Sequence, residues 1–198
     1  MRLLIGTNNK GKIIEIAQVL SDLPIEIKAP KDLGIVKMPS ETGETFEENA
    51  LQKARFYFDQ SGCPTVADDS GIEVDALVGE LGIHTRRWGA GPEASDEEWI
   101  AYFLKRMNGE KNRKARFVCA LAYIDADGAV HGFRGTCEGV ITRTLEADYL
   151  PGLPISACFK PDGCERVYSA MSIEQKNRTS HRGKAVHQLA DFLRHQFK

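Results

Sequence analysis

The sequence lacks the features of disulfide-stapled, zinc-ribbon and membrane-spanning proteins. It has five cysteines, an odd number with no CxxC pair, which argues against a full disulfide framework and against a zinc ribbon. The longest uninterrupted apolar run covers residues 117–124, far below the roughly 20 residues that a membrane-crossing helix needs. The N-terminus has neither the length nor the cleavage site of a secretory signal. We therefore expect a cytoplasmic protein with no membrane partner.

A large excess of charge is also absent. The formal net charge is −2, so the chain as a whole has no electrostatic reason to bind a nucleic acid polymer, and any basic site must be local. The hydrophobic fraction of 42% and the charged fraction of 27% are ordinary for a folded protein. Neither a repeat nor a linker-like stretch interrupts the chain. We expect a single domain over residues 1–198.

Apolar strands alternate with amphipathic helices along the first half of the sequence. A buried strand over residues 3–6 is followed by a polar loop and then by a helix with apolar residues at helical spacing. A capping box at residues 45–48 predicts a second helix that ends near Gly62. Another box at residues 95–98 predicts a third. These elements indicate an α/β fold.

The second half predicts a long hairpin and a closing helix. Asp127-Gly128 is a strong turn signal between the apolar segments 117–124 and 130–144, so two antiparallel strands are expected. The sheet is therefore predicted to be mixed. A last amphipathic helix starts near Ser180.

A first group of polar residues follows the first strand. Thr7, Asn9 and Lys12 lie at a strand-to-helix turn, where loop and helix-start N–H groups can bind phosphate. The GxxxxGKS/T spacing of a Walker loop is absent. An ordinary capped helix start would account for the same three residues.

A second group is acidic. A short strand at residues 65–67 runs into Asp68 and Asp69, so both carboxylates are expected at a strand's carboxyl end, where open α/β sheets hold their ligands. Glu41, in the loop before the second helix, is a third acid. Such a sparse set of oxygen ligands suits Mg²⁺ (or Mn²⁺). The alternative is a solvated Glu41 and an Asp69 that only caps a turn.

A third group is basic. Lys176, His181 and Arg182 gather near the start of the last helix, where positive charge opposes the helix dipole. An anion bound between them would explain their position better than stability does. Lys53, on the second helix, is a further candidate cation, although a single helical lysine is more often solvated.

Together these segments resemble one family, the inosine triphosphate pyrophosphatases, over nearly the whole chain. The resemblance rests on four ordered blocks: TNNKGK (7–12), ETGETFEENALQKA (41–54), ADDSGIEVDAL (67–77) and KNRTSHR (176–182). It implies an elongated two-lobed α/β fold with a long mixed sheet, an active-site cleft between the lobes, and usually a homodimer. It also implies hydrolysis of nucleoside triphosphates to the monophosphate and pyrophosphate.

The resemblance also implies roles for particular residues. Asp69 and Lys12 would be catalytic. The substrate would be bound by eight residues: Thr7, Asn9, Lys12, Lys53, Ser70, Lys176, His181 and Arg182. The metal would be bound by Glu41 and Asp69, with Asp68 beside them.

One block departs from the family pattern. Where the family has a loop reading roughly Gly-Phe-Gly-Tyr-Asp-Pro, whose aromatic stacks on the base and whose acid reads the base edge, this chain has residues 152–157, GLPISA. Leu153 has no π-face, Ser156 is an uncharged partner, and Pro154 fixes φ. The sequence therefore leaves open whether this chain shares the family's preference for deaminated purines.

Three hypotheses follow. The first is a metal-dependent pyrophosphatase that removes deaminated or modified nucleotides. The second keeps the reaction but changes the base, to a pyrimidine or another modified base. The third is a catalytically silent nucleotide-binding module. The enzyme hypotheses require that Glu41 and Asp69 face a wall carrying four cations: Lys12, Lys53, Lys176 and Arg182.

Overall fold

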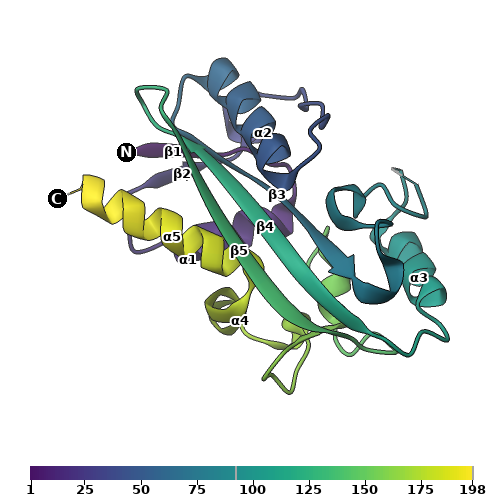
Figure 1. Ribbon diagram of the computed structural model, residues 1–198. Coiled ribbons are helices and arrows are strands. Elements are labelled where there is room, and N and C mark those ends of the chain that lie inside the picture. Colours follow the sequence, from purple (N-terminus) through teal and green to yellow (C-terminus); the bar gives the residue numbers. More distant parts are fainter. Residues whose placement is uncertain (92, 198) are drawn as a thin grey trace.

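The computed structural model describes residues 1–91 and 93–197 as an α/β fold built on one mixed six-stranded sheet (Figure 1). The strand order is β2-β1-β3-β4-β5-β6; β1 is parallel to β2 and β3, and the other pairs are antiparallel. The strands are β1 (Arg2–Ile5), β2 (Glu26–Lys28), β3 (Thr65–Val74), β4 (Lys114–Ile124), β5 (Val130–Ile141) and β6 (Phe159–Pro161). The predicted α/β class and mixed sheet are confirmed. One domain over residues 1–198 stays a prediction.

Helices cover both faces of the sheet. They are α1 (Lys10–Val19), α2 (Phe46–Ser61), α3 (Asp96–Arg106), α4 (Ile173–Thr179) and α5 (His181–Gln196). Figure 1 shows α1 and α5 on one face, α2 on the other, and α3 at the far end of the β4–β5 hairpin. No described helix combines the length and apolar character required to cross a bilayer.

The helix boundaries follow from the capping residues in the sequence. The Thr45 hydroxyl accepts a hydrogen bond from the Glu48 N–H at 3.1 Å, and Ser95 caps α3 in the same way. Gly62 ends α2 in the left-handed conformation with φ 63°, which a glycine adopts without strain. Ser180 caps α5 through the Gly183 N–H. These helices were predicted correctly, whereas the short α4 was not predicted.

The β4–β5 hairpin joins the two lobes. Its strands pair from Ile124 and Val130 at the turn to Lys114 and Val140 at the other end, so β4 starts three residues before the predicted segment. At the turn end the hairpin packs against α2 and α5, and at the other end it shares a core with α3. One rigid ribbon therefore holds both sides of the cleft.

The predicted position of the acidic pair on its strand is wrong. β3 continues to Val74, because β4 pairs with all ten of its residues, so Asp68 and Asp69 lie inside the strand and not at its end. The strand that does end here is β1, which pairs with β3 only at Thr65 and Val66. Beyond Val66 this edge of β3 has no neighbouring strand in the described residues, and the cleft forms there.

The backbone of α5 lies so close to β5 at Gly135 that this position has no room for a side chain. A Cβ at this position would lie 2.1 Å from the His181 carbonyl oxygen, so Gly135→Ala should lower the free energy of unfolding by about 1–3 kcal/mol through overpacking. Gly132→Ala, on the same strand with its nearest neighbour atom at 4.0 Å, is the control and should cost little. Urea denaturation measures both, and equal losses would contradict the packing argument.

Candidate active site

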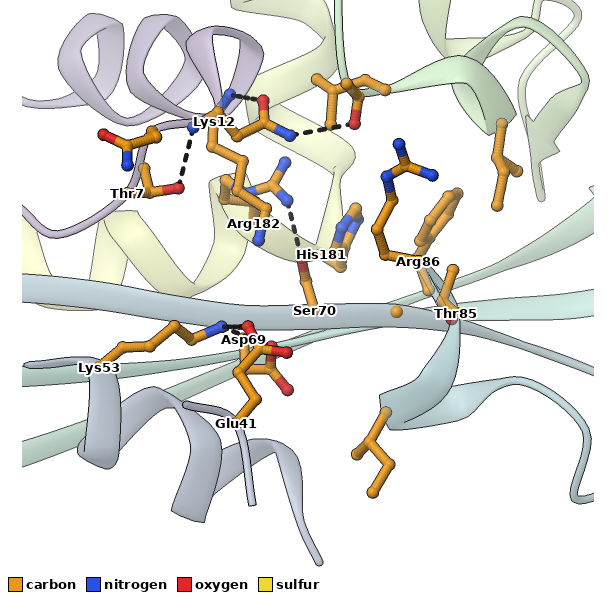
Figure 2. A pocket seen from close by; sticks show the side chains of 18 of the residues that line it. Thr7, Lys12, Glu41, Lys53, Asp69, Ser70, Thr85, Arg86, His181 and Arg182 are labelled. Atoms are coloured by element: carbon orange, nitrogen blue, oxygen red, sulfur yellow. Dashed lines mark hydrogen bonds and ion pairs between the residues drawn. The ribbon is translucent and has the colours of Figure 1, made fainter. Parts of the chain in front are cut away.

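A cleft of about 470 Å³ opens along the free edge of β3, a volume typical of small-molecule sites (Figure 2). The loop after β1, the segment before α2, the turn after β3 and the loop before β6 contribute to its walls. Twelve of the thirteen predicted site residues line it: Thr7, Asn9, Lys12, Glu41, Lys53, Asp69, Ser70, Leu153, Ser156, Lys176, His181 and Arg182. Asp68 is the exception. Residues from five separate segments of the sequence therefore meet in one cavity.

The loop between β1 and α1 is held in shape by its own side chains. Asn9 caps α1 by accepting the Lys12 N–H at 3.1 Å, and the Thr7 hydroxyl accepts the Asn9 N–H at 3.2 Å. The Asn9 amide also donates to the Gly152 carbonyl at 3.1 Å. Leu153 presses so closely on Gly11 that a Cβ there would lie 2.7 Å from its Cδ1. The phosphate-binding candidates are thus fixed against residues 152–153.

Asp68 and Asp69 point to opposite faces of β3, as successive residues of a strand must. Asp68 Oδ2 lies 3.0 Å from Lys12 Nζ and 3.2 Å from Arg182 Nε, and it accepts a hydrogen bond from the Ser70 hydroxyl. Burial alone would raise the Asp68 pKa, but Lys12 and Arg182 outweigh it and hold that pKa well below its usual range. Asp68 therefore stays ionised as the partner of two cations.

On the other face, Asp69 shares Lys53 with Glu41. Lys53 Nζ lies 2.7 Å from Asp69 Oδ1 and 3.0 Å from Glu41 Oε1, and Lys53 is only 8% exposed. The expectation of Lys53 on a wall opposite the acids is therefore wrong, as is the alternative of a solvated lysine. Figure 2 shows Lys53, Asp69 and Glu41 together on one side of β3, with Lys12 on the other.

The pKa values of these three groups reflect burial and mutual charge. Burial raises the pKa of Asp69, and this outweighs the opposing effect of Lys53. Burial acts against the Lys53 ammonium, but the nearby carboxylates, Asp69 first, raise its pKa overall. For Glu41, burial is again opposed by Lys53, and the net pKa is lowered. Asp69 is the carboxyl with the stronger tendency to take a proton.

Glu41 and Asp69 fit a divalent cation. Asp69 Oδ2 is buried without a hydrogen-bond partner, an oxygen that a metal ion would satisfy. No cluster of three or more His, Cys, Asp or Glu side chains suited to a metal occurs within residues 1–91 and 93–197. Proteins usually contribute one or two carboxylates to a Mg²⁺ site, and water and substrate oxygens provide the other ligands. Asp68 is not placed with them, because its side chain lies on the other face of β3 among cations.

Glu15 neutralises the basic group, and its role was missed in the sequence. Its carboxylate lies 2.5 Å from Lys176 Nζ, pairs also with Arg182, and is 1% exposed. The prediction that stability does not explain these cations is therefore wrong, because Glu15 pairs with both of them inside the protein. An acidic residue within the apolar run Ile13–Ala17 of α1 was the available signal.

His181 is a buried neutral ring. It stacks on Phe117 with ring centres 4.5 Å apart and planes 9° apart. Burial, reinforced by Arg182 and Lys176, holds the pKa of His181 well below its usual range. In the divergent loop, the Ser156 hydroxyl is buried and accepts a hydrogen bond from Lys176 at 3.2 Å. The loop thus packs into the protein and still lines the cleft.

Further cleft residues come from a turn that gave no sequence signal. Arg87 Nη1 lies 3.7 Å from a Glu41 oxygen. Arg86 reaches into the cleft and donates to the Ala94 carbonyl at 2.6 Å. Trp99, on α3, also lines the cleft and donates to the Thr85 carbonyl.

An α/β fold with a phosphate-suited loop and a two-carboxylate site in one cleft defines a class of nucleotide-hydrolysing enzymes. The chain belongs to the Ham1 family, whose model matches residues 3–192.

Named relatives and solved structures agree with this family. The chain is 40% identical over 193 residues to a dITP/XTP pyrophosphatase of Leptospira interrogans, covering 98% of this chain and 97% of that protein. It is 39% identical to one from Exiguobacterium, covering 96% and 95%. The Ham1 protein structure from Staphylococcus aureus superposes with a TM-score of 0.82 at 32% identity, covering 99% and 100%. One from Coxiella burnetii gives 0.83 at 31%, covering 98% and 99%.

Removing the Glu15 charge should destabilise the protein. Glu15→Gln keeps the side-chain shape but leaves Lys176 and Arg182 with too little negative charge, so we expect a loss of about 3 kcal/mol in the free energy of unfolding. Glu26→Gln removes exposed pairs with Arg2 and Lys28 and should have little effect. Urea titrations of both variants check this, and an unchanged Glu15→Gln midpoint would contradict it.

His181 should make the protein less stable in mild acid. Its folded pKa lies below its unfolded value near 6.5, so only the unfolded chain takes up this proton as the pH falls below 6.5. Stability should then fall by up to about 1.4 kcal/mol per pH unit from this group. His181→Phe keeps an aromatic ring against Phe117 and should flatten the profile between pH 6.5 and 5. A variant with the unchanged slope would contradict the assignment.

Proposed function

We propose that this chain hydrolyses deaminated nucleoside triphosphates, such as dITP and XTP, to the monophosphate and pyrophosphate. The relatives' printed names support the substrate and the reaction. The observation that carries the proposal is the Glu41–Lys53–Asp69 group, which shares one cleft with the Thr7–Lys12 loop. A carboxylate pair beside a phosphate-suited loop serves cleavage of a phosphoanhydride bond.

The proposed binding roles follow the hydrogen bonds and charges. Thr7, Asn9 and the N–H groups at the start of α1 hold phosphate oxygens. Lys12 adds positive charge on one side of β3 and Lys53 on the other. Because Asp68 and Asp69 fix these ammonium groups beforehand, little reorganisation is needed when the triphosphate binds. Ser70 contributes a hydroxyl beside them.

Glu41 and Asp69 are proposed to hold Mg²⁺ or Mn²⁺, without Asp68. When bound, such an ion neutralises phosphate charge and makes the α-phosphorus more electrophilic. Asp69 is also the proposed base, through whichever carboxylate oxygen does not face the ion, because its side chain lines the cleft beside the phosphate-suited loop. A water molecule gives its proton to Asp69 while its oxygen bonds to the α-phosphorus. The bond to the bridging oxygen breaks, and pyrophosphate leaves with that oxygen.

The same reaction on another base is the second candidate. It is motivated by the loop before β6, where Leu153 lines the cleft without an aromatic face and Ser156 is engaged by Lys176. Pyrophosphate release measured over dITP, XTP, dUTP and the four ordinary triphosphates separates the two. A clear preference for dITP or XTP favours the first candidate. A binding module would release no pyrophosphate from any of them.

Three further features are proposed: the resemblance supports the dimer, and the net charge of −2 argues against a nucleic acid polymer as partner. We propose that the chain acts as a homodimer in the cytoplasm and that no nucleic acid polymer is its partner. Light scattering coupled to size exclusion gives the mass in solution and thus tests the dimer.

Asp69→Asn should abolish turnover while leaving the fold intact. The amide cannot accept the proton of water and is a poor metal ligand, so we expect kcat/KM to fall by about 10²- to 10⁴-fold on every accepted nucleotide. Asp127→Asn, in the exposed hairpin turn, is the matched control and should match the parent. Pyrophosphate release is measured for both, with thermal unfolding as the check of folding. Retained turnover in Asp69→Asn would refute its assigned role.

A further inference from the structure

Arg86 lies at the end of the cleft away from the phosphate-suited loop. Gly6 bonds to β3 at Val66, which fixes the Thr7 loop at the start of the free edge. The turn that carries Arg86 is fixed further along, where the Thr85 hydroxyl accepts the Ile72 N–H at 3.0 Å. Figure 2 shows Arg86 beyond His181, on the side opposite Thr7 and Lys12.

The separation along β3 suits a nucleotide. From Asp68, beside the phosphate loop, to Ile72, beside the Arg86 turn, the strand rises about 13 Å at roughly 3.3 Å per residue. An extended nucleoside triphosphate whose phosphates lie near Lys12 is therefore long enough for its base to reach Arg86.

Arg86 also differs from the other cations of the cleft in having no carboxylate partner among the described residues. Lys12, Lys53, Lys176 and Arg182 each pair with a buried carboxylate, and Arg87 lies near Glu41. Within the described part of the chain, Arg86 forms no ion pair, and its one hydrogen bond is the contact with Ala94. Most of its guanidinium N–H donors remain available to a ligand.

The neighbouring loop offers no charged acceptor for a base. Ser156 stands where the family pattern has an acid, and its hydroxyl already accepts from Lys176. Two donors line the cleft here, the Arg86 guanidinium and the Lys176 ammonium, together with the His181 ring, whose Nδ1 is buried without a hydrogen-bond partner. Lys176 is already engaged by Glu15 and Ser156, whereas Arg86 keeps several unengaged N–H groups, which favours a base that presents acceptor atoms.

We propose that Arg86 determines base specificity by donating two parallel N–H groups to O6 and N7 of a 6-oxopurine. A planar guanidinium matches these two acceptors, whereas adenine presents an N–H₂ donor in place of O6. The protein would thus contact the N7 side of the purine through a hydrogen-bond donor. In the usual family loop an acid, which accepts hydrogen bonds, contacts the base edge instead. This inference rests on the proposed function, because it needs a nucleotide in the cleft.

The test measures kcat/KM for dITP, 7-deaza-dITP and dATP with the parent protein and with Arg86→Met. The parent should favour dITP over 7-deaza-dITP, which lacks the N7 acceptor, and over dATP. Arg86→Met keeps the length of the side chain without its donors, so dITP turnover should fall about 10- to 100-fold. The kcat/KM values for 7-deaza-dITP and dATP should change much less, so that the variant hydrolyses all three nucleotides with similar kcat/KM.

Arg86→Lys is the control for charge alone. It keeps the positive charge but not the two parallel N–H groups of the guanidinium, so the selectivity for dITP over 7-deaza-dITP should still be lost. If Arg86 instead binds phosphate, Arg86→Met lowers all three values equally and Arg86→Lys restores them, which overturns the proposal. Equal parent turnover of dITP and 7-deaza-dITP also overturns it. Absence of pyrophosphate release from every nucleotide in the parent would instead refute the proposed function.

Discussion

The alternation of side chains along the free edge of β3 is the constraint on which the site depends. It directs Asp68 toward Lys12 and Arg182 and Asp69 toward Lys53, so adjacent carboxylates serve different faces of the sheet. A one-residue shift in the pairing of β3 with β4 would exchange the two environments. The long hairpin ladder that fixes this register is therefore as important to the site as the acids themselves.

Buried charge in the cleft is nearly balanced before any ligand arrives. Glu15 and Asp68 hold Lys176, Arg182 and Lys12, while Glu41 and Asp69 hold Lys53. Unpaired buried ions would be costly, and pairing lets the fold keep several cations in one apolar lobe. The same pairs keep the ammonium groups in place for a polyphosphate, so stability and preorganisation have one physical origin.

The two ends of the cleft are proposed to bind different parts of the nucleotide. At the phosphate end, Asn9 and Gly152 link two distant loops through one hydrogen bond, and the expected residues line the cavity. Leu153, Pro154 and Ser156 replace the usual loop from this point onward, and the Arg86 turn closes on β3 at the other end. The residues proposed to bind phosphate and metal therefore lie apart from Arg86, which is proposed to bind the base.

The sequence by itself determined the local elements and the residue types of the site. Caps at Thr45, Ser95 and Ser180 set the helix starts, and Asp127-Gly128 set the hairpin, because these signals act over a few residues. Only the tertiary structure decided the partners of the charges. The length of β3 depends on its pairing with β4, and Lys53 and Glu15 find their partners on other elements of the fold. Such contacts between distant segments leave no local pattern, which is why the ion pairs and the Arg86 turn were not predicted.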